Sequence, residues 1–177
     1  MRKSIFYWQV TGFIFTITLG VFLHFLFDMT NRNMIAALFS AVNESIWEHL
    51  KLLFYPMFLF ALVENKFLEK EYAQFWCVKL KGILLGLLLI PVLYYTYNGS
   101  FGKSKDWMNI AIFVIVVGIV YWVETRLFRS AKQCRVPKEG ALIALCAIAL
   151  VFSVFTFATP RIPLFQDPIT GTYGFYE

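Results

Sequence analysis

Four stretches of the chain contain no Asp, Glu, Lys or Arg and are long enough to cross a lipid bilayer as helices. They are residues 4–27, 82–102, 107–123 and 140–160, and a spanning helix needs about 20 mainly apolar residues, within a range of roughly 17–25. Hydrophobic residues make up 59% of the sequence and charged residues 15%, against about 45–50% and about 25% in soluble domains. A soluble core of this size could not bury so much apolar surface, so the surrounding solvent must be lipid.

A fifth uncharged stretch, between Lys51 and Glu64, has only 12 residues. At about 1.5 Å per residue it reaches roughly 18 Å, well short of a hydrocarbon core of about 30 Å. A spanning helix here must therefore carry Lys51, His49 and Glu48 into the outer part of the bilayer. Such groups are costly at that depth unless they are paired or face water or the interior of the bundle.

We predict an all-α fold, a polytopic membrane helix bundle that forms a single domain over residues 1–177. The expected elements are transmembrane helices at about 4–27, 45–66, 78–97, 107–128 and 140–159, a short interfacial helix at about 34–42, and a tail at 160–177. Asn43 is expected to cap the second spanning helix. Gly82 and Gly86 lie four residues apart in the third, a spacing that allows close helix contact.

The basic residues are divided unequally between the two ends of the predicted helices. Eleven lie at the end that holds the N-terminus and five at the other end. Because basic residues gather in cytoplasmic loops, we expect the N-terminus inside and the C-terminus outside. The net charge of +5 then reflects membrane topology, and we expect no nucleic-acid partner. Cys77 and Cys134 fall near the cytoplasmic side and Cys146 inside the fifth helix, so no disulfide is expected.

The segment most informative about function is residues 43–51, which read Asn-Glu-Ser-Ile-Trp-Glu-His-Leu-Lys. Helical spacing puts Glu44, Glu48 and Lys51 on one stripe, with His49 beside it. Two carboxylates crowded on one face are unfavourable unless a cation, a proton or a basic partner neutralises them.

Three further polar residues are expected at the same, outer end of the bundle. His24 and Asp28 lie four residues apart at the end of the first helix, and the tail brings Asp167 there. Topology alone thus gathers six groups on one side: His24, Asp28, Glu44, Glu48, His49 and Asp167.

Imidazole and carboxylate groups together are ligands suited to zinc, manganese or iron. A divalent metal with an open position could activate water for hydrolysis. In this hypothesis Glu48 and Glu44 are catalytic, and the metal ligands are His49, His24 and Asp28. The site is closed by Asn43, Lys51 and Asp167. The loops are too short for a soluble domain, so the expected substrate is an amphiphile or small molecule that reaches the outer leaflet from the lipid bilayer.

Other interpretations of the same residues stay open. Glu48 with Lys51 could form a structural ion pair, and Glu44 could serve only the start of a helix. A proton- or cation-coupled carrier would use the same carboxylates, and with five helices it would need a homodimer to build a path. A haem or quinone protein would use His24 and His49 as ligands. A non-catalytic accessory subunit would use the polar groups to dock a partner.

Residues 43–51, together with residues 163–174, carry a resemblance to a family of small five-helix bacterial membrane proteins catalogued as a domain of unknown function. Its mark in this chain is the pattern Asn-Glu-Ser-x-Trp-Glu-His, and the resemblance extends over the whole chain. It implies a multi-pass protein of the bacterial cytoplasmic (inner) membrane. It implies no activity.

Overall fold

The computed structural model describes residues 2–102, 105–130 and 134–175, and the described part of the chain is all-helical. Five helices are long: α1 (Arg2–Met29), α3 (Ile46–Leu68), α4 (Phe75–Phe101), α5 (Asp106–Arg129) and α6 (Lys138–Phe157). Two short ones accompany them, α2 (Met34–Ala37) and the 3-10 helix η1 (Pro163–Phe165). All five long helices are long and apolar enough to cross a membrane, which confirms the predicted fold class.

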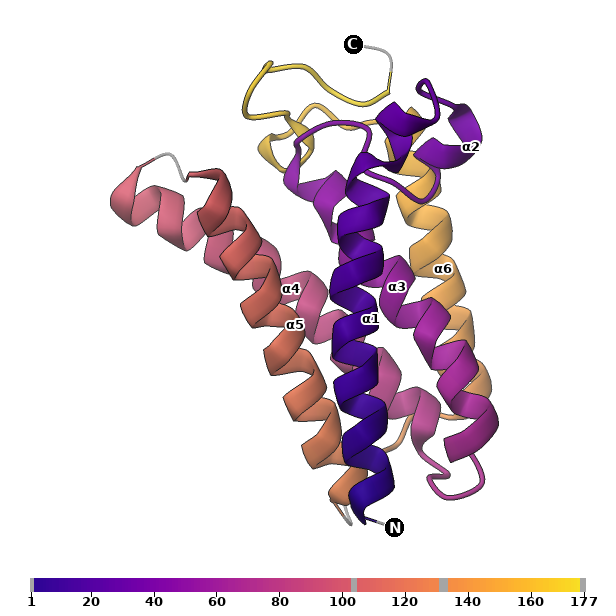
Figure 1. The fold of residues 1–177 in the computed structure, drawn as a ribbon. Coiled ribbons are helices and arrows are strands. Elements are labelled where there is room, and N and C mark those ends of the chain that lie inside the picture. The colour runs from indigo at the N-terminus through magenta and orange to yellow at the C-terminus, as the bar shows by residue number, and fades with distance from the viewer. Residues whose placement is uncertain (1, 103–104, 131–133, 176–177) are drawn as a thin grey trace.

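Helix α3 forms the centre of the bundle and packs against α1, α4 and α6. Helices α4 and α5 run side by side, and toward the end away from the N-terminus they lean away from α1 and α3 (Figure 1). The C-terminal tail folds back over that same end, next to the segment that joins α1 to α3. The cavity of the candidate site is lined by residues of α1, α3, α4 and α5.

Small residues let the helices approach closely at the crossings. A Cβ atom on Gly12 would lie 2.6 Å from the Tyr121 ring, and one on Gly86 would lie 2.9 Å from the Leu53 side chain. One on Gly82 would lie 2.2 Å from the Glu124 carboxylate. The predicted pair Gly82 and Gly86 therefore does lie at close helix contacts, with α5 at the first and with α3 and α5 at the second.

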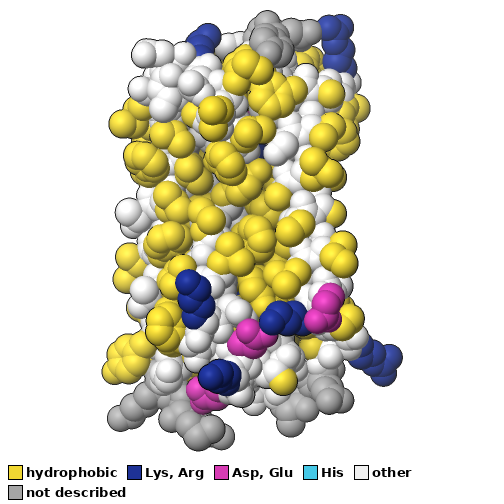
Figure 2. Space-filling view, turned by 90° about the vertical axis from the view of Figure 1, so that its right-hand side faces the viewer, with side chains coloured by type: hydrophobic (Ala, Val, Ile, Leu, Met, Phe, Trp, Pro, Cys, Tyr) yellow, Lys and Arg dark blue, Asp and Glu magenta, His cyan; other side chains and the backbone are white. Residues whose placement is uncertain are grey.

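Apolar side chains cover the middle of the molecular surface. In Figure 2 they form a broad band over one face, with Lys, Arg, Asp and Glu side chains gathered below it at the N-terminal end of the bundle. This distribution is that of a protein whose lateral surface contacts lipid.

One expectation about the N-terminal end was wrong. Cys77 at the start of α4 and Cys134 after α5 form a disulfide, with Cα atoms 6.1 Å apart. Sequence reasoning excluded it because both cysteines were assigned to a reducing compartment, and it could not show that α4 and the segment after α5 meet. Lys79 lies inside α4 at the same end and is 1% exposed.

Candidate functional site

Helix α3 starts at a cap that also prepares the site. The side chain of Ser45 accepts a hydrogen bond from the backbone N–H of Glu48 (3.3 Å). Ser45, rather than the predicted Asn43, is therefore the N-cap. Asn43 instead accepts a hydrogen bond from the Ser45 N–H (2.9 Å) and donates one to the Gly174 carbonyl (3.2 Å). These contacts hold the entry to α3 and the C-terminal tail against each other.

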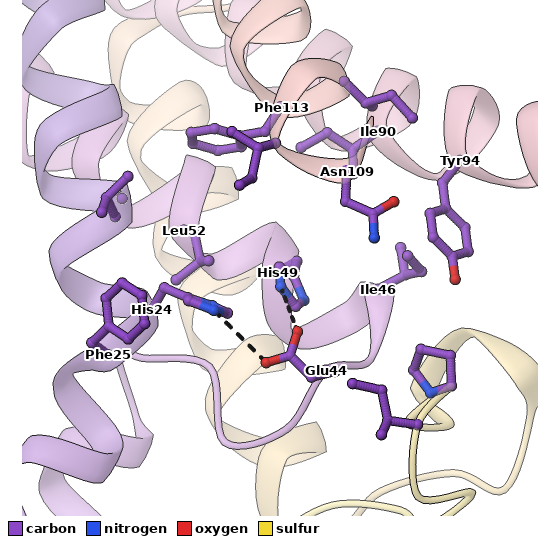
Figure 3. Close-up of a pocket in the computed structure, with 16 residues that line it drawn as sticks. His24, Phe25, Glu44, Ile46, His49, Leu52, Ile90, Tyr94, Asn109 and Phe113 are labelled. Carbon is purple, nitrogen blue, oxygen red and sulfur yellow. Dashed lines mark ion pairs between the residues drawn. The ribbon is translucent and has the colours of Figure 1, made fainter. Parts of the chain in front are cut away.

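Three of the predicted site residues meet at the outer end of the bundle. His24 comes from α1, Glu44 from the segment before α3, and His49 from the first turns of α3 (Figure 3). Glu44 lies between the two rings. One carboxylate oxygen is 3.7 Å from His24 Nε2, and the other is 3.4 Å from His49 Nε2. The ring centroids of the histidines are 5.2 Å apart.

The hydrogen bond of His49 Nδ1 determines which nitrogen can bind a ligand. Nδ1 lies 2.9 Å from the Ser45 carbonyl oxygen, which can only accept, so Nδ1 must carry the hydrogen. In the neutral ring Nε2 then has the free lone pair, and it points toward the Glu44 carboxylate. Two acceptors facing each other require a proton or a cation between them. In proteins, a hydrogen bond donated by the ring nitrogen that does not bind the metal is what orients a metal-binding histidine.

The surroundings of Glu44 favour its charged form. A hydrogen bond from the protonated His49 ring lowers the pKa of Glu44 below its usual value, and the charges of the protonated histidine rings act in the same direction, while partial burial opposes them. The side chain is 43% exposed, so water can reach it. The site thus offers one carboxylate and two imidazoles to the same point in space.

The three groups have the spacing of a metal site. One ligand atom from each lies within 4.8 Å of the others. Ligands at about 2.0–2.2 Å from a tetrahedral zinc ion lie about 3.3–3.6 Å apart. The nitrogen–oxygen distances of 3.7 and 3.4 Å are close to that, and each goes to a different oxygen of Glu44. Three protein ligands leave a fourth position for water or substrate.

The cluster lies at one end of a mainly apolar cavity of about 440 Å³. Helices α1, α3, α4 and α5 and the tail line it, through residues that include Val21, Phe25, Leu52, Ile90, Phe113 and Ile169. Gly20 also lines it, and a Cβ there would lie 2.8 Å from the Leu52 carbonyl oxygen. Tyr94 and Asn109 add polar groups to the wall opposite Glu44 (Figure 3).

Glu48 and Lys51 lie away from this cluster. The Lys51 ammonium contacts the Glu48 carboxylate (2.5 Å), the Ala37 carbonyl (2.8 Å) and the Thr156 hydroxyl (3.0 Å). Glu48 also accepts from the Val42 N–H at 3.1 Å. Both side chains are almost fully buried. They form a buried ion pair that joins α3 to α2 and α6.

The two predicted aspartates have different positions. Asp28 is exposed, and its carboxylate is 4.0 Å from Arg32 Nε, outside the cluster. Asp167 is buried and accepts hydrogen bonds from the Glu44 N–H (3.3 Å) and from the N–H groups of Ile169 and Thr170 (2.7 and 3.2 Å). Asp167 thus fixes the backbone of Glu44 and folds the turn of the tail that lines the cavity.

Sequence reasoning missed the cavity-lining residues Tyr94 and Asn109 and the cap Ser45. Asn109 carried a usable signal, as a polar side chain inside the apolar stretch 107–123. Tyr94 did not, since aromatic residues at helix ends are typical of any membrane protein.

Comparison with known proteins gives one match. A family model described as "Family of unknown function (DUF6512)" matches residues 2–175. Neither a curated protein nor a solved structure matches the chain.

Proposed function

The chain belongs to DUF6512, a family of unknown function, and we propose that it is a multi-pass membrane protein that binds a divalent transition metal at His24, Glu44 and His49. The observation that carries this proposal is the convergence of the three groups at the polar end of an apolar cavity. They come from three separate segments of the chain, so their meeting is a property of the tertiary structure and not of one helix.

The donor set favours zinc, with manganese and iron as the next candidates. Two imidazoles and one carboxylate with an open position are typical of catalytic zinc sites. The Ser45 carbonyl, which orients His49, supplies the supporting contact such sites need. Asp167 supplies another, through the backbone of Glu44.

We infer that the site acts as a hydrolase on an amphiphile at the outer leaflet. A metal with an open position lowers the pKa of a bound water and polarises an ester or amide carbonyl. The cavity volume of about 440 Å³ lies within the usual range for small-molecule sites, roughly 300–1,000 Å³. Its mainly apolar walls would hold a hydrocarbon portion while the reacting polar group lies against the metal.

The roles of the individual residues follow from their positions. Glu44 serves as a metal ligand, since its two oxygens face the two histidines. Glu48 serves the scaffold, because Lys51, Thr156 and the Val42 N–H already occupy its carboxylate. Asn43 and Asp167 hold the segment that carries Glu44, and Lys51 holds Glu48.

Metal content tests the proposal. The wild-type protein, purified in detergent and equilibrated with zinc, should retain about one equivalent through gel filtration, and Glu44→Gln and His49→Ala should each lose it. Asp28→Asn is the matched control, since Asp28 is at the same end of the bundle and outside the cluster. Folded wild-type protein that retains no zinc, manganese or iron would contradict the proposal and favour an accessory role. A loss of zinc from Asp28→Asn as large as that from Glu44→Gln would also contradict the proposal.

Hydrolysis needs its own measurement. The metal-loaded protein in liposomes should release product from a fluorogenic ester with a short hydrocarbon chain, and the Glu44→Gln protein should not. Metal retention without turnover of any such amphiphile would keep the metal site and reject the hydrolase.

A further inference from the structure

A second buried polar cluster lies at the opposite, N-terminal end of the bundle. It contains Glu64 of α3, Lys79 of α4 and Glu124 of α5, all at most 1% exposed. The Lys79 ammonium is 2.5 Å from a Glu64 oxygen and 2.7 Å from a Glu124 oxygen. Gln9 of α1 donates a hydrogen bond to the other Glu64 oxygen (3.0 Å). Four helices thus meet at one set of charges.

The charges of this cluster do not balance if every group is ionised. Two carboxylates face one ammonium, and Lys79 Nζ also lies over the rings of Phe75, Tyr121 and Phe128, with centroids 5.4–5.7 Å away. Gln9 is uncharged, and the Tyr121 hydroxyl pairs with Thr16 at 2.9 Å. One uncompensated negative charge would remain in the interior of a membrane bundle, where an unpaired charge costs several kcal/mol.

The two carboxylates are not equally well stabilised as anions. Glu64 accepts a hydrogen bond from Gln9 on Oε1, and its Oε2 lies 2.5 Å from the Lys79 ammonium, an ion pair without hydrogen-bond geometry. Glu124 contacts Lys79 with Oε2 only, and its Oε1 has no hydrogen-bond partner among the described residues. The amide oxygen of Gln9, 3% exposed, also lacks a partner there. Glu124 is therefore the carboxylate with the weaker support for a negative charge.

A proton suits this site better than a metal ion does. Glu124 Oε1 is packed against α4 so closely that a Cβ on Gly82 would lie 2.2 Å from it. An ion with several oxygen ligands would not fit between them, and the Lys79 ammonium would repel it. From these contacts we propose that Glu124 binds a proton, so that Glu64, Lys79 and Glu124 form a proton-binding site in the transmembrane bundle.

Infrared spectroscopy of the full-length protein tests this inference. Wild-type protein at neutral pH should show a carboxylic-acid carbonyl band that is absent from Glu124→Gln, and raising the pH should remove it. A wild-type spectrum with no carboxylic-acid carbonyl band at neutral pH overturns the proposal, whether or not the variant folds.

Stability gives an independent measurement. The amide of Glu124→Gln resembles a neutral carboxyl group, so this variant should keep the wild-type melting temperature at neutral pH. Glu64→Gln is the matched control and should melt lower, because an amide replaces the ionised partner of Gln9 and Lys79. Wild-type melting should fall as the pH rises, since the folded bundle holds a proton that the unfolded chain has released, and Glu124→Gln should not follow that fall. A Glu124→Gln variant as unstable as Glu64→Gln contradicts the proposal.

Discussion

The orientation of one imidazole ring determines what the outer cluster can bind. His49 donates a hydrogen bond from Nδ1 to the backbone carbonyl of Ser45. Ser45 is the N-cap of α3 and lies four residues earlier in the chain. The same cap therefore starts α3 and directs His49 Nε2 toward Glu44. A histidine one position away on the helix would point about 100° from this direction and could not share a ligand with His24 and Glu44.

The proposed metal site should release its ion on acidification with a steep dependence on pH. The pKa of Glu44 lies below its usual value, so this carboxylate stays ionised and does not compete for protons until the pH is below about 4.3. Both imidazoles must be unprotonated to bind, so at pH values where both rings are protonated in the metal-free protein the apparent affinity should fall about a hundredfold per pH unit. Zinc titration against a competing chelator measures this slope. A tenfold fall in affinity per pH unit would mean that only one histidine binds the metal. An affinity that does not fall above pH about 4.3 would exclude both histidines as ligands.

Sequence reasoning identified the three members of this cluster but could not separate them from their neighbours. His24, Glu44 and His49 were predicted together with Glu48, Asp28 and Asp167 because topology puts all six at one end. The separation depends on how α3 is rotated about its axis. That rotation sends Glu48 and Lys51 toward Thr156 of α6 and His49 toward α1, and a single helix pattern contains no information about its partners.

At the scale of the helices, the pair Glu48 and Lys51 should behave as a structural unit. Glu48→Gln or Lys51→Met alone leaves one buried charge unpaired and should cost about 3–5 kcal/mol of stability. The double variant removes both charges and keeps an acceptor for the Val42 N–H, so it should be more stable than either single variant. Denaturant unfolding in detergent measures these differences, and the folded double variant should retain its metal. Additive losses would show that the two side chains act independently.

The crossing of α1 with α3 and α5 should depend on the absence of a side chain at Gly12. Gly12→Ala places a methyl group 2.6 Å from the Tyr121 ring and 2.7 Å from the Phe60 ring, and overpacking of this kind costs about 1–3 kcal/mol. Gly99→Ala is the matched control, because no atom of the described residues lies within 4 Å of its Cβ position in α4; it should be neutral or gain up to about 1 kcal/mol of helix stability. Equal melting temperatures for the two variants would contradict the close packing.

The number and type of the helices could be predicted because the bilayer sets their length and permits little other backbone structure. Contacts between helices could not be predicted in the same way. Lys79 and Glu124 lie 45 residues apart in sequence, yet they form a buried ion pair. The hydrophobic pattern ends near both residues, which gives their depth only approximately, and their pairing depends on how α4 crosses α5.

For the molecule as a whole, the unequal distribution of basic residues predicts that the N-terminus is cytoplasmic. Lys79 and Lys51 are buried, and each comes from a different end of the bundle. If both are left out of the count, the N-terminal end still has more basic residues than the other end. Orientation then assigns the proposed metal site to the outer leaflet and the proposed proton site to the inner half of the bundle. The Cys77–Cys134 disulfide favours the opposite orientation, because disulfides persist in oxidising compartments.

Reporter fusions distinguish these two orientations. A phosphatase that is active only outside the cytoplasm should be active when fused to the C-terminus and inactive when fused after α3. A fluorescent protein that matures only inside should give the reverse pattern. We expect the arrangement set by the basic residues, because they act while the helices insert, whereas the disulfide can form only after α4 and α5 have packed together. Phosphatase activity after α3 would reverse the assignment and place the disulfide outside, with the metal site facing the cytoplasm.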